Sequence, residues 1–305
     1  MIERRSFLTS LALGVAGLRS ELPFATSLPK RGQIAFSTLG CPKWDWLTIL
    51  DFAVRHGFAA IELRGILESM DLTQRPEFSP SQLARTRAQL AERELRVAGL
   101  GSSANMHEPD PARRAAQLAE ARSFIDLAHA LDAPYVRVFG NKYVEGEARE
   151  TTIERIARGL RELADHARGK NVTVLLESHG DFTDSPTLLK ILELADSPRV
   201  ALLWDAHHTF AFSNEAPEDT VRQLARYIRH THLKDSVPAD GGRRYVLTGT
   251  GEVPVRRQLE ALAANGYNGF YCFEWEKRWH PEIEEPEVAF PHYADYVRQY
   301  LHAGA

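Results

Sequence analysis

Cysteine is scarce in this chain, with only Cys41 and Cys272 among 305 residues. Two thiols provide no cysteine-rich metal site and no dense disulfide framework. A disulfide between them stays open as one interpretation in an oxidising compartment, but we expect both to be small buried hydrophobic residues. The N-terminal region contains no cysteine, so the sequence offers no support for a lipid anchor there.

Excess charge and long apolar runs are also lacking. The formal net charge is −4, and it becomes −5 when residues 1–25, with their three Arg and two Glu, are left out. An acidic chain has no general attraction to nucleic acid or to an anionic membrane, so we expect neither as a partner. The apolar run near the N-terminus is about 12 residues, shorter than the roughly 20 that a membrane-spanning helix needs, which argues against a stable membrane anchor.

The opening residues, MIERRSFLTSLALGVAGL, place Arg4 and Arg5 ahead of that short apolar run. This pattern resembles a twin-arginine export signal, and we expect residues 1–25 to be that signal and the protein to be periplasmic or secreted. Cleavage after either Gly14-Val15-Ala16 or Pro23-Phe24-Ala25 stays open. The alternative is an ordinary basic N-terminal tail.

The remaining chain predicts one domain, a (β/α)8 TIM barrel over residues 30–305. Its length is close to the roughly 250 residues of such a barrel, and 44% hydrophobic and 26% charged residues are ordinary for a soluble domain. Apolar runs and helical patterns alternate eight times, and no other repeat is visible. We expect strands at 34–37, 59–63, 97–100, 135–139, 172–176, 200–204, 228–233 and 270–273, and helices near 44–56, 81–92, 111–128, 153–163, 185–195, 217–227, 255–265 and 287–302.

Four successive apolar runs end in a residue that can bind a metal ion: Glu177, Asp205, His232 and Glu274. They are separated by 28, 27 and 42 residues, each enough for one strand, one helix and two loops. In a parallel barrel all strands end at the same mouth, so these side chains can meet there. Three carboxylates and one imidazole suit one hard or borderline divalent ion, such as Mn, Mg, Co or Zn. The alternative for each residue is a purely structural role, as a strand-end side chain that caps a helix or pairs with a neighbour.

The chain after about residue 30 resembles the xylose isomerase-like TIM barrels, specifically the sugar phosphate isomerase/epimerase group. The motifs that carry this resemblance are AIELRG at 60–65, YVRVFG at 135–140, ESH at 177–179, DxxH at 205–208, HLKD at 232–235, GTGEVP at 249–254 and FEWE at 273–276. The resemblance implies that Glu177, Asp205, His232 and Glu274 bind one divalent ion and that Glu177 and Glu274 also move protons. Two positions depart from the best-known ketose epimerases of the group: Pro238 stands for an arginine and Thr183 for an acidic residue. Metal binding is therefore better supported than any particular sugar.

Further polar residues lie on the inward face of the predicted strands or at their ends, and His208 is expected one turn into the loop that follows Asp205. His179 and His208 are expected to hydrogen-bond a sugar hydroxyl, or else to act as supporting or capping histidines. Glu62 and Arg64 are expected to bind substrate as an ion pair beneath it, with a purely structural pair as the alternative. Lys234 and Asp235 are expected to contact substrate or to form a lysine–carboxylate pair beside the metal. His230 is expected to pack beneath His232. The segment 236–255 is expected to form a loop over the mouth, or a solvated hairpin.

These residues predict a divalent-metal-dependent sugar isomerase or epimerase that works through an enediolate on a free or oxidised sugar. Export and the lack of a glycine-rich phosphate loop disfavour a phosphorylated substrate. The alternatives are a metal-dependent lyase of 3-oxo-glycosides, a phosphodiesterase like the apurinic-site endonucleases, and a non-catalytic periplasmic sugar-binding protein. The expected partner is a small carbohydrate, and assembly into a homo-oligomer is left open.

Overall fold

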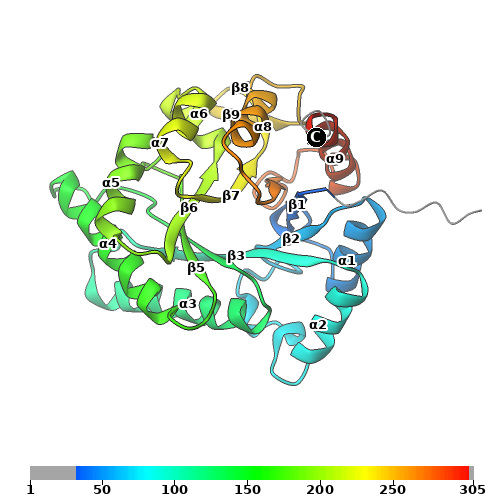
Figure 1. Ribbon diagram of the computed structural model, residues 1–305, viewed down its shortest axis with the longest axis horizontal. Coiled ribbons are helices and arrows are strands. Elements are labelled where there is room, and N and C mark those ends of the chain that lie inside the picture. Colours follow the sequence, from blue (N-terminus) through cyan, green and yellow to red (C-terminus); the bar gives the residue numbers. More distant parts are fainter. Residues whose placement is uncertain (1–31, 302–305) are drawn as a thin grey trace, which may run out of the picture.

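The computed structural model describes residues 32–301, and the predicted export signal lies outside this range. Within it, eight parallel strands close into a barrel in the order β1-β10-β7-β6-β5-β4-β3-β2. Helices surround the strands (Figure 1). The expected single (β/α)8 TIM barrel is therefore confirmed as the fold.

The barrel strands lie close to the predicted ranges. They are β1 (Ile34–Ser37), β2 (Ala60–Leu63), β3 (Arg96–Asn105), β4 (Tyr135–Phe139), β5 (Thr173–Glu177), β6 (Val200–Asp205), β7 (Ile228–Leu233) and β10 (Tyr271–Phe273). The helices are α1 (Trp46–Arg55), α2 (Leu83–Glu92), α3 (Pro111–Ala130), α4 (Arg149–His166), α5 (Ser185–Ala195), α6 (Ala206–Ser213), α7 (Pro217–Leu224), α8 (Val255–Ala264) and α9 (Pro286–Leu301). Short 3-10 turns occupy Thr38–Gly40, Leu72–Gln74 and Pro76–Phe78. Among these described helices, none has the length and apolar content needed to cross a membrane.

Helix starts follow from capping residues in the sequence. Asp110 accepts a hydrogen bond from the Arg113 amide at 2.8 Å, and Pro111 occupies the first helical position of α3. Asp184 caps α5 in the same way, through the Thr187 amide at 2.9 Å. A carboxylate at this position satisfies an amide that the helix itself leaves unbonded.

The strands are buried on both faces, as a covered parallel sheet requires. Outside the barrel, the strands pack against the helices in one large apolar cluster. Inside, the core beneath the mouth is built from small and medium residues: Ala35, Ala60, Ala98 and Cys272 in one cluster, and Leu175, Ala201 and Leu203 in another. Cys41 and Cys272 are both buried and free, so the described part of the chain holds no disulfide between them.

Two elements of the mouth differ from the first expectation: one helix was not predicted, and one hairpin was predicted only as an alternative to a loop. Helix α6 follows β6 directly, where we expected a loop around His208. Strands β8 (Asp235–Ala239) and β9 (Gly242–Val246) form an antiparallel hairpin within the segment expected to cover the mouth. Both elements follow the carboxyl end of a barrel strand, the end at which such barrels place their chemistry.

Candidate metal centre

The structure brings together the four side chains at the ends of consecutive strands. Glu177 ends β5, Asp205 ends β6, His232 is the next-to-last residue of β7, and Glu274 directly follows β10. One potential ligand atom from each lies within 4.8 Å of the others, and all four residues are buried. These side chains converge because alternate residues of a strand point into the barrel and because all the parallel strands end at the same mouth.

The imidazole of His232 is the centre of this cluster. Its Nδ1 lies 3.1 Å from Oε1 of Glu274 and 3.7 Å from Oε1 of Glu177. Burial alone would lower the pKa of His232, but the carboxylates of Glu274 and Glu62 outweigh burial and raise that pKa well above its ordinary value. The protonated imidazole therefore neutralises part of the negative charge of the surrounding carboxylates.

The opposite nitrogen of the same ring contacts Glu62. Oε2 of Glu62 lies 2.7 Å from Nε2 of His232 and 2.9 Å from Nε2 of His230. His230 thus packs beneath His232, as the sequence indicated. Burial opposes ionisation of Glu62, but the two histidines hold the pKa of this carboxyl well below its usual range.

This contact corrects the expected pair of Glu62 and Arg64. Among the described residues, no ion pair joins these two side chains, because Glu62 turns toward the histidines of β7 while Arg64 Nη1 donates to the Gly101 carbonyl at 3.3 Å. Glu62 is 2% exposed and lies on the Nε2 side of His232. It is therefore placed to support His232, while its expected contact with substrate stays a prediction.

A buried lysine crosses the mouth. Nζ of Lys234 lies 2.6 Å from Oδ2 of Asp205 and 3.1 Å from Oε1 of Glu276, and it also contacts Oε2 of Glu274. Burial opposes the charge, but the three carboxylates outweigh it and raise the pKa of Lys234. Of the two expected roles, the structure shows the lysine–carboxylate pair.

Two arginines lie near Glu177, and one of them, Arg137, is on the neighbouring strand β4. Nε of Arg137, in β4, lies 3.0 Å from Oε2 of Glu177. Burial opposes ionisation of Glu177, but Arg137 outweighs it and lowers the pKa of this carboxyl to about 2. Burial and the nearby Arg137 lower the pKa of Arg64 to about 9. Glu177 is therefore held as a carboxylate.

Gly101 separates the two guanidinium groups. A Cβ atom at this position would lie 2.6 Å from Cδ of Arg64 and 2.7 Å from Nη2 of Arg137. A side chain here would force both arginine side chains to shift, including Arg137, which pairs with Glu177.

Three histidines complete the mouth. His208 in α6 lies 3.3 Å from Oδ2 of Asp205 through Nδ1, and its backbone amide donates to Oδ1 of Asp205 at 3.0 Å. His179 packs edge-on against His208, with ring centroids 5.0 Å apart. Nε2 of His207 bonds Oγ of Ser236 at 2.7 Å. His179 and His208 thus lie beside the metal-ligand candidates, where the sequence indicated substrate contacts.

Gly180 makes the turn that positions His179. Its φ is +63°, and a Cβ atom there would lie 1.9 Å from the carbonyl oxygen of Asn141. Only glycine permits this close approach without moving the backbone.

Asp235 has a structural role that was not expected. Its carboxylate accepts the backbone amides of Ser236, Gly249, Gly251 and Val253 at 2.8–3.1 Å. All four amides belong to the hairpin and the segment that follows it. Asp235 therefore ties this segment to the barrel, and its expected contact with substrate stays a prediction.

The charges around the mouth fit a divalent cation. Five carboxylates, of Glu62, Glu177, Asp205, Glu274 and Glu276, face three permanent cations, of Arg64, Arg137 and Lys234. A bound ion would displace the proton of His232, and with the histidines then neutral two negative charges would remain, which is the charge that one divalent ion neutralises. Oε2 of Glu177 and Nδ1 of His232 are buried and make no hydrogen bond of good geometry, although Arg137 and Glu274 lie 3.0 and 3.1 Å from them. Oxygen and imidazole donors suit such an ion, so the residues present fit a metal site.

Sequence reasoning missed Arg137, Glu276 and His207 as members of the site. Arg137 lies within a motif quoted for its family resemblance, and Glu276 follows Glu274 by two residues on the same inward face. Strand alternation could have identified both. His207 offered no such signal, because its position depends on the unpredicted helix α6.

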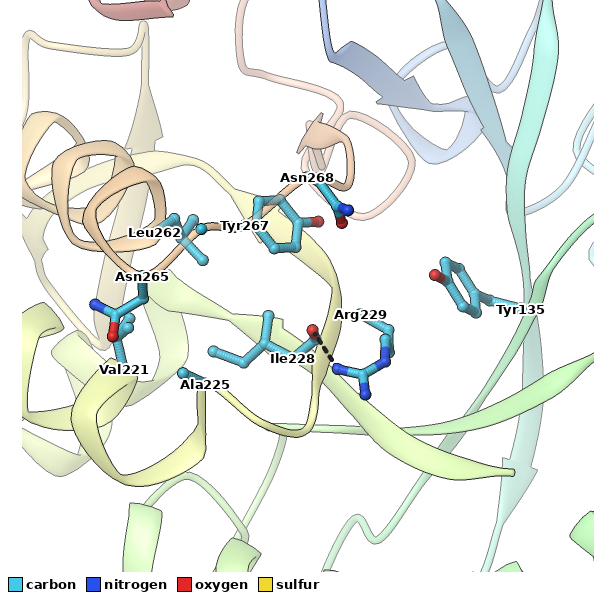
Figure 2. Close-up of a pocket in the computed structure, with 10 residues that line it drawn as sticks. Tyr135, Val221, Ala225, Ile228, Arg229, Leu262, Asn265, Tyr267 and Asn268 are labelled. Carbon is cyan, nitrogen blue, oxygen red and sulfur yellow. Dashed lines mark hydrogen bonds between the residues drawn. The ribbon is translucent and has the colours of Figure 1, made fainter. Parts of the chain in front are cut away.

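A separate cavity of about 170 Å³ lies away from this cluster, at the amino-terminal ends of the strands (Figure 2). Tyr135 and Ile228, which line it, are the first residues of β4 and β7. Barrel enzymes carry out their chemistry at the opposite end. We therefore assign the chemistry to the carboxylate and histidine cluster.

Fold and site together define a parallel barrel with an acidic, histidine-containing mouth. A sequence profile of the xylose isomerase-like TIM barrel family matches residues 50–300. The chain belongs to this family, which confirms the resemblance seen in its motifs.

Individual relatives agree with this assignment. The L-ribulose-5-phosphate 3-epimerase UlaE of Escherichia coli (strain SMS-3-5 / SECEC) is 26% identical over 83% of this chain and 89% of its own length. The fold is similar to that of the 3-keto-D-glucoside 4-epimerase YcjR from E. coli, at a TM-score of 0.71 and 15% identity, covering 88% of this chain and 99% of that one. It is also similar to that of an IOLI protein with a bound zinc atom, at a TM-score of 0.72 and 18% identity, covering 88% and 98%. These findings support an enzyme of the isomerase and epimerase class.

Proposed function

We propose that this protein is a divalent-metal-dependent sugar isomerase or epimerase that moves a proton at a carbon next to a carbonyl group of a free or oxidised sugar. The observation that carries the proposal is the position of two glutamates around one imidazole nitrogen, with Glu274 and Glu177 at 3.1 and 3.7 Å from Nδ1 of His232. The proposed ligands are Glu177, Asp205, His232 and Glu274, and the candidate ions are Mn, Mg, Co and Zn. When bound, such an ion supplies positive charge that stabilises oxygen anions of the substrate.

The two glutamates carry the proton transfer in this proposal. One carboxylate removes the proton from the carbon beside the carbonyl, and the electron pair moves onto the carbonyl oxygen to form an enediolate. The other returns a proton, either to the opposite face of the same carbon, which gives an epimer, or to the neighbouring carbon, which gives an aldose–ketose isomer. Glu177 and Glu274 come from different strands, so they can face the substrate from two sides.

Neighbouring residues orient these groups. Arg137 holds the Glu177 carboxylate, and Lys234 holds one oxygen of Glu274. His179 and His208 are the proposed partners of sugar hydroxyls, and their position beside Asp205 supports this role.

We further propose a free or oxidised sugar, although the UlaE relative is named for a phosphorylated one. No glycine-rich phosphate loop occurs in the sequence, and the N-terminal segment resembles an export signal. Cytoplasmic phosphorylated intermediates would not meet an exported enzyme. Periplasmic or secreted localisation, with residues 1–25 as the signal, is part of this proposal.

A lyase of 3-oxo-glycosides is the second candidate. This reaction needs an acid beside the departing oxygen. Glu276 offers one: burial raises the pKa of this carboxyl, although Lys234 opposes the shift. Its side chain is 12% exposed, so it borders the surface of the site.

The test is incubation with Mn²⁺ and a panel of free sugars, 3-oxo-glycosides and L-ribulose 5-phosphate, followed by product analysis. The proposal predicts an epimer or isomer of a free or oxidised sugar. Release of the aglycone would establish the lyase, and turnover of the phosphorylated sugar alone would overturn the proposed substrate class. Metal analysis of the same protein should give about one equivalent, whereas two or three would favour the nuclease interpretation.

A further inference from the structure

One oxygen of Glu62 joins two histidines across the barrel interior. Glu62 lies on β2, whereas His230 and His232 lie on β7, and β1 and β10 separate these strands in the barrel order. All three side chains are at most 2% exposed. A buried carboxylate with only two imidazole donors within reach is costly unless both donors are used.

The contact decides which nitrogen of His232 carries a hydrogen. An ionised carboxylate can only accept hydrogen bonds, so the Nε2 atoms of both histidines must donate. The neutral form of His232 then carries its lone pair on Nδ1, the nitrogen that faces Glu177 and Glu274. Nδ1 makes no hydrogen bond of good geometry, although Oε1 of Glu274 lies 3.1 Å away.

We propose that Glu62 is the positioning residue that makes Nδ1 of His232 the metal-binding nitrogen, with His230 as the second anchor of the Glu62 carboxylate. A carboxylate that accepts the second N–H of a metal-binding histidine fixes the ring and makes it a more basic ligand. The inference rests on the single-ion part of the proposed function and on none of its sugar chemistry.

The same cluster has one rival interpretation. Glu62, His230, His232 and Cys272 each offer an atom within 4.8 Å of the others, so they could hold a second ion themselves. The hydrogen bonds argue against this, because Nε2 of each histidine is already engaged by Glu62. Metal stoichiometry and the Cys272→Ala variant distinguish a positioning role of Glu62 from a second metal site.

The direct test needs no variant. Protein labelled with nitrogen-15 histidine is loaded with cadmium, and the cadmium–nitrogen coupling identifies the bound nitrogen of His232, assigned by its loss in His232→Gln. The inference predicts coupling to Nδ1 and a retained hydrogen on Nε2. Coupling to Nε2 would overturn it.

The second test compares metal affinities by competition with a chromophoric chelator. Glu62→Gln keeps the volume and one acceptor oxygen but removes the negative charge that strengthens both hydrogen bonds and makes His232 a more basic ligand, so affinity should fall about 10–100-fold. Cys272→Ala is the matched control: it removes a fully buried neighbour of His232 in strand register without removing one of these hydrogen bonds, so affinity should stay near that of the wild type. His230→Gln should cause a smaller loss, since it removes one anchor and keeps the Glu62 charge.

Each result has a defined meaning. Unchanged affinity in Glu62→Gln, or equal losses in Glu62→Gln and Cys272→Ala, would overturn the inference. Two ions in the wild type with one lost in Cys272→Ala would replace it with the second metal site. Failure of the wild type to bind any ion would instead refute the metal-dependent function. If Glu62→Gln does not fold, His230→Gln and the cadmium coupling still decide.

Discussion

Lys234 Nζ lies 2.6 Å from Oδ2 of Asp205 and contacts Glu274, so one buried ammonium pairs with two of the four proposed metal ligands. The lysine therefore offsets charge that a divalent ion would also offset. The lysine and the proposed ion would share the same carboxylates, and this would link stability to metal content.

Removing the ammonium should destabilise the metal-free protein. Lys234→Met leaves buried carboxylates without their partner, and breaking a buried pair in this way costs about 3–5 kcal/mol of unfolding free energy. Added Mn²⁺ should raise the free energy of unfolding of this variant by more than it raises that of the wild type. Chemical denaturation with and without Mn²⁺ measures both effects.

Lys277→Met is the matched control. Lys277 is also buried, but it donates to the carbonyls of Pro281 and Ile283, away from the proposed ligands. Lys277→Met should lose stability, but Mn²⁺ should stabilise it no more than it stabilises the wild type. The same metal response in both variants would contradict the shared-carboxylate account.

Asp235 should control the hairpin of β8 and β9. Asp235→Asn keeps the shape but turns one acceptor into a donor, and a hydrogen bond to a charged group is worth about 1.5–3 kcal/mol. Cleavage by trypsin after Arg243 or Arg244 should therefore become roughly tenfold faster or more. Asp240→Asn, at the exposed turn of the hairpin, should leave the rate unchanged, and equal rates in both variants would show that Asp235 does not hold this segment.

Acid should weaken the connection between Glu147 and helix α4, which follows it. Arg155 and Thr152 bond Glu147 and lower the pKa of this carboxyl to about 2, from an ordinary 4.5. Because the folded pKa is the lower one, the stabilisation is present above pH 4.5 and is lost as pH falls toward 2.

The measurement is the urea midpoint of the wild type and Glu147→Gln over this range. The wild type should be more stable above pH 4.5, and the difference should shrink as the pH falls. Glu145→Gln, an exposed neighbour, should show no such trend. A difference that grows in acid would contradict the sign of the shift.

Export can be tested independently of the fold. Replacing Arg4 and Arg5 with lysine should leave the protein in the cytoplasm, whereas Arg19→Lys should not. Cell fractionation with immunodetection measures this. Delivery of the double variant to the periplasm would show that the signal assignment is wrong.

Much of the fold could be predicted because each barrel strand is a compact apolar run with a helical pattern behind it. The run VALLWD, for example, became β6, and Asp110-Pro111 began α3. The residues after Asp205 were harder, because the histidine-rich and aromatic segment 206–213 has no apolar stripe. Its helix starts because the Asp205 side chain caps it.

The site was predictable only in part, because alternation shows which side chains point inward but not which of them meet. Glu62 and Arg64 share one face of a strand, which suggested a pair. The contact that forms instead joins Glu62 to His230, 168 residues away. Such a contact depends on barrel closure and strand stagger, which no local pattern contains.

The assignment of proton transfer to Glu177 and Glu274 is the central chemical claim. Replacing either with Gln at saturating metal should lower turnover by about 10² to 10⁴, the usual contribution of general acid–base catalysis. Saturating metal is needed because an amide is a poorer ligand than a carboxylate. Full activity in both variants would contradict the assignment.

The most direct measurement follows the substrate hydrogen itself. During turnover by the wild type in deuterated water, the enediolate account predicts that deuterium enters the carbon beside the carbonyl, and that the label appears in product and in recovered substrate. Mass spectrometry and proton NMR of both locate it. Turnover without any incorporated deuterium would indicate a hydride shift and contradict the account.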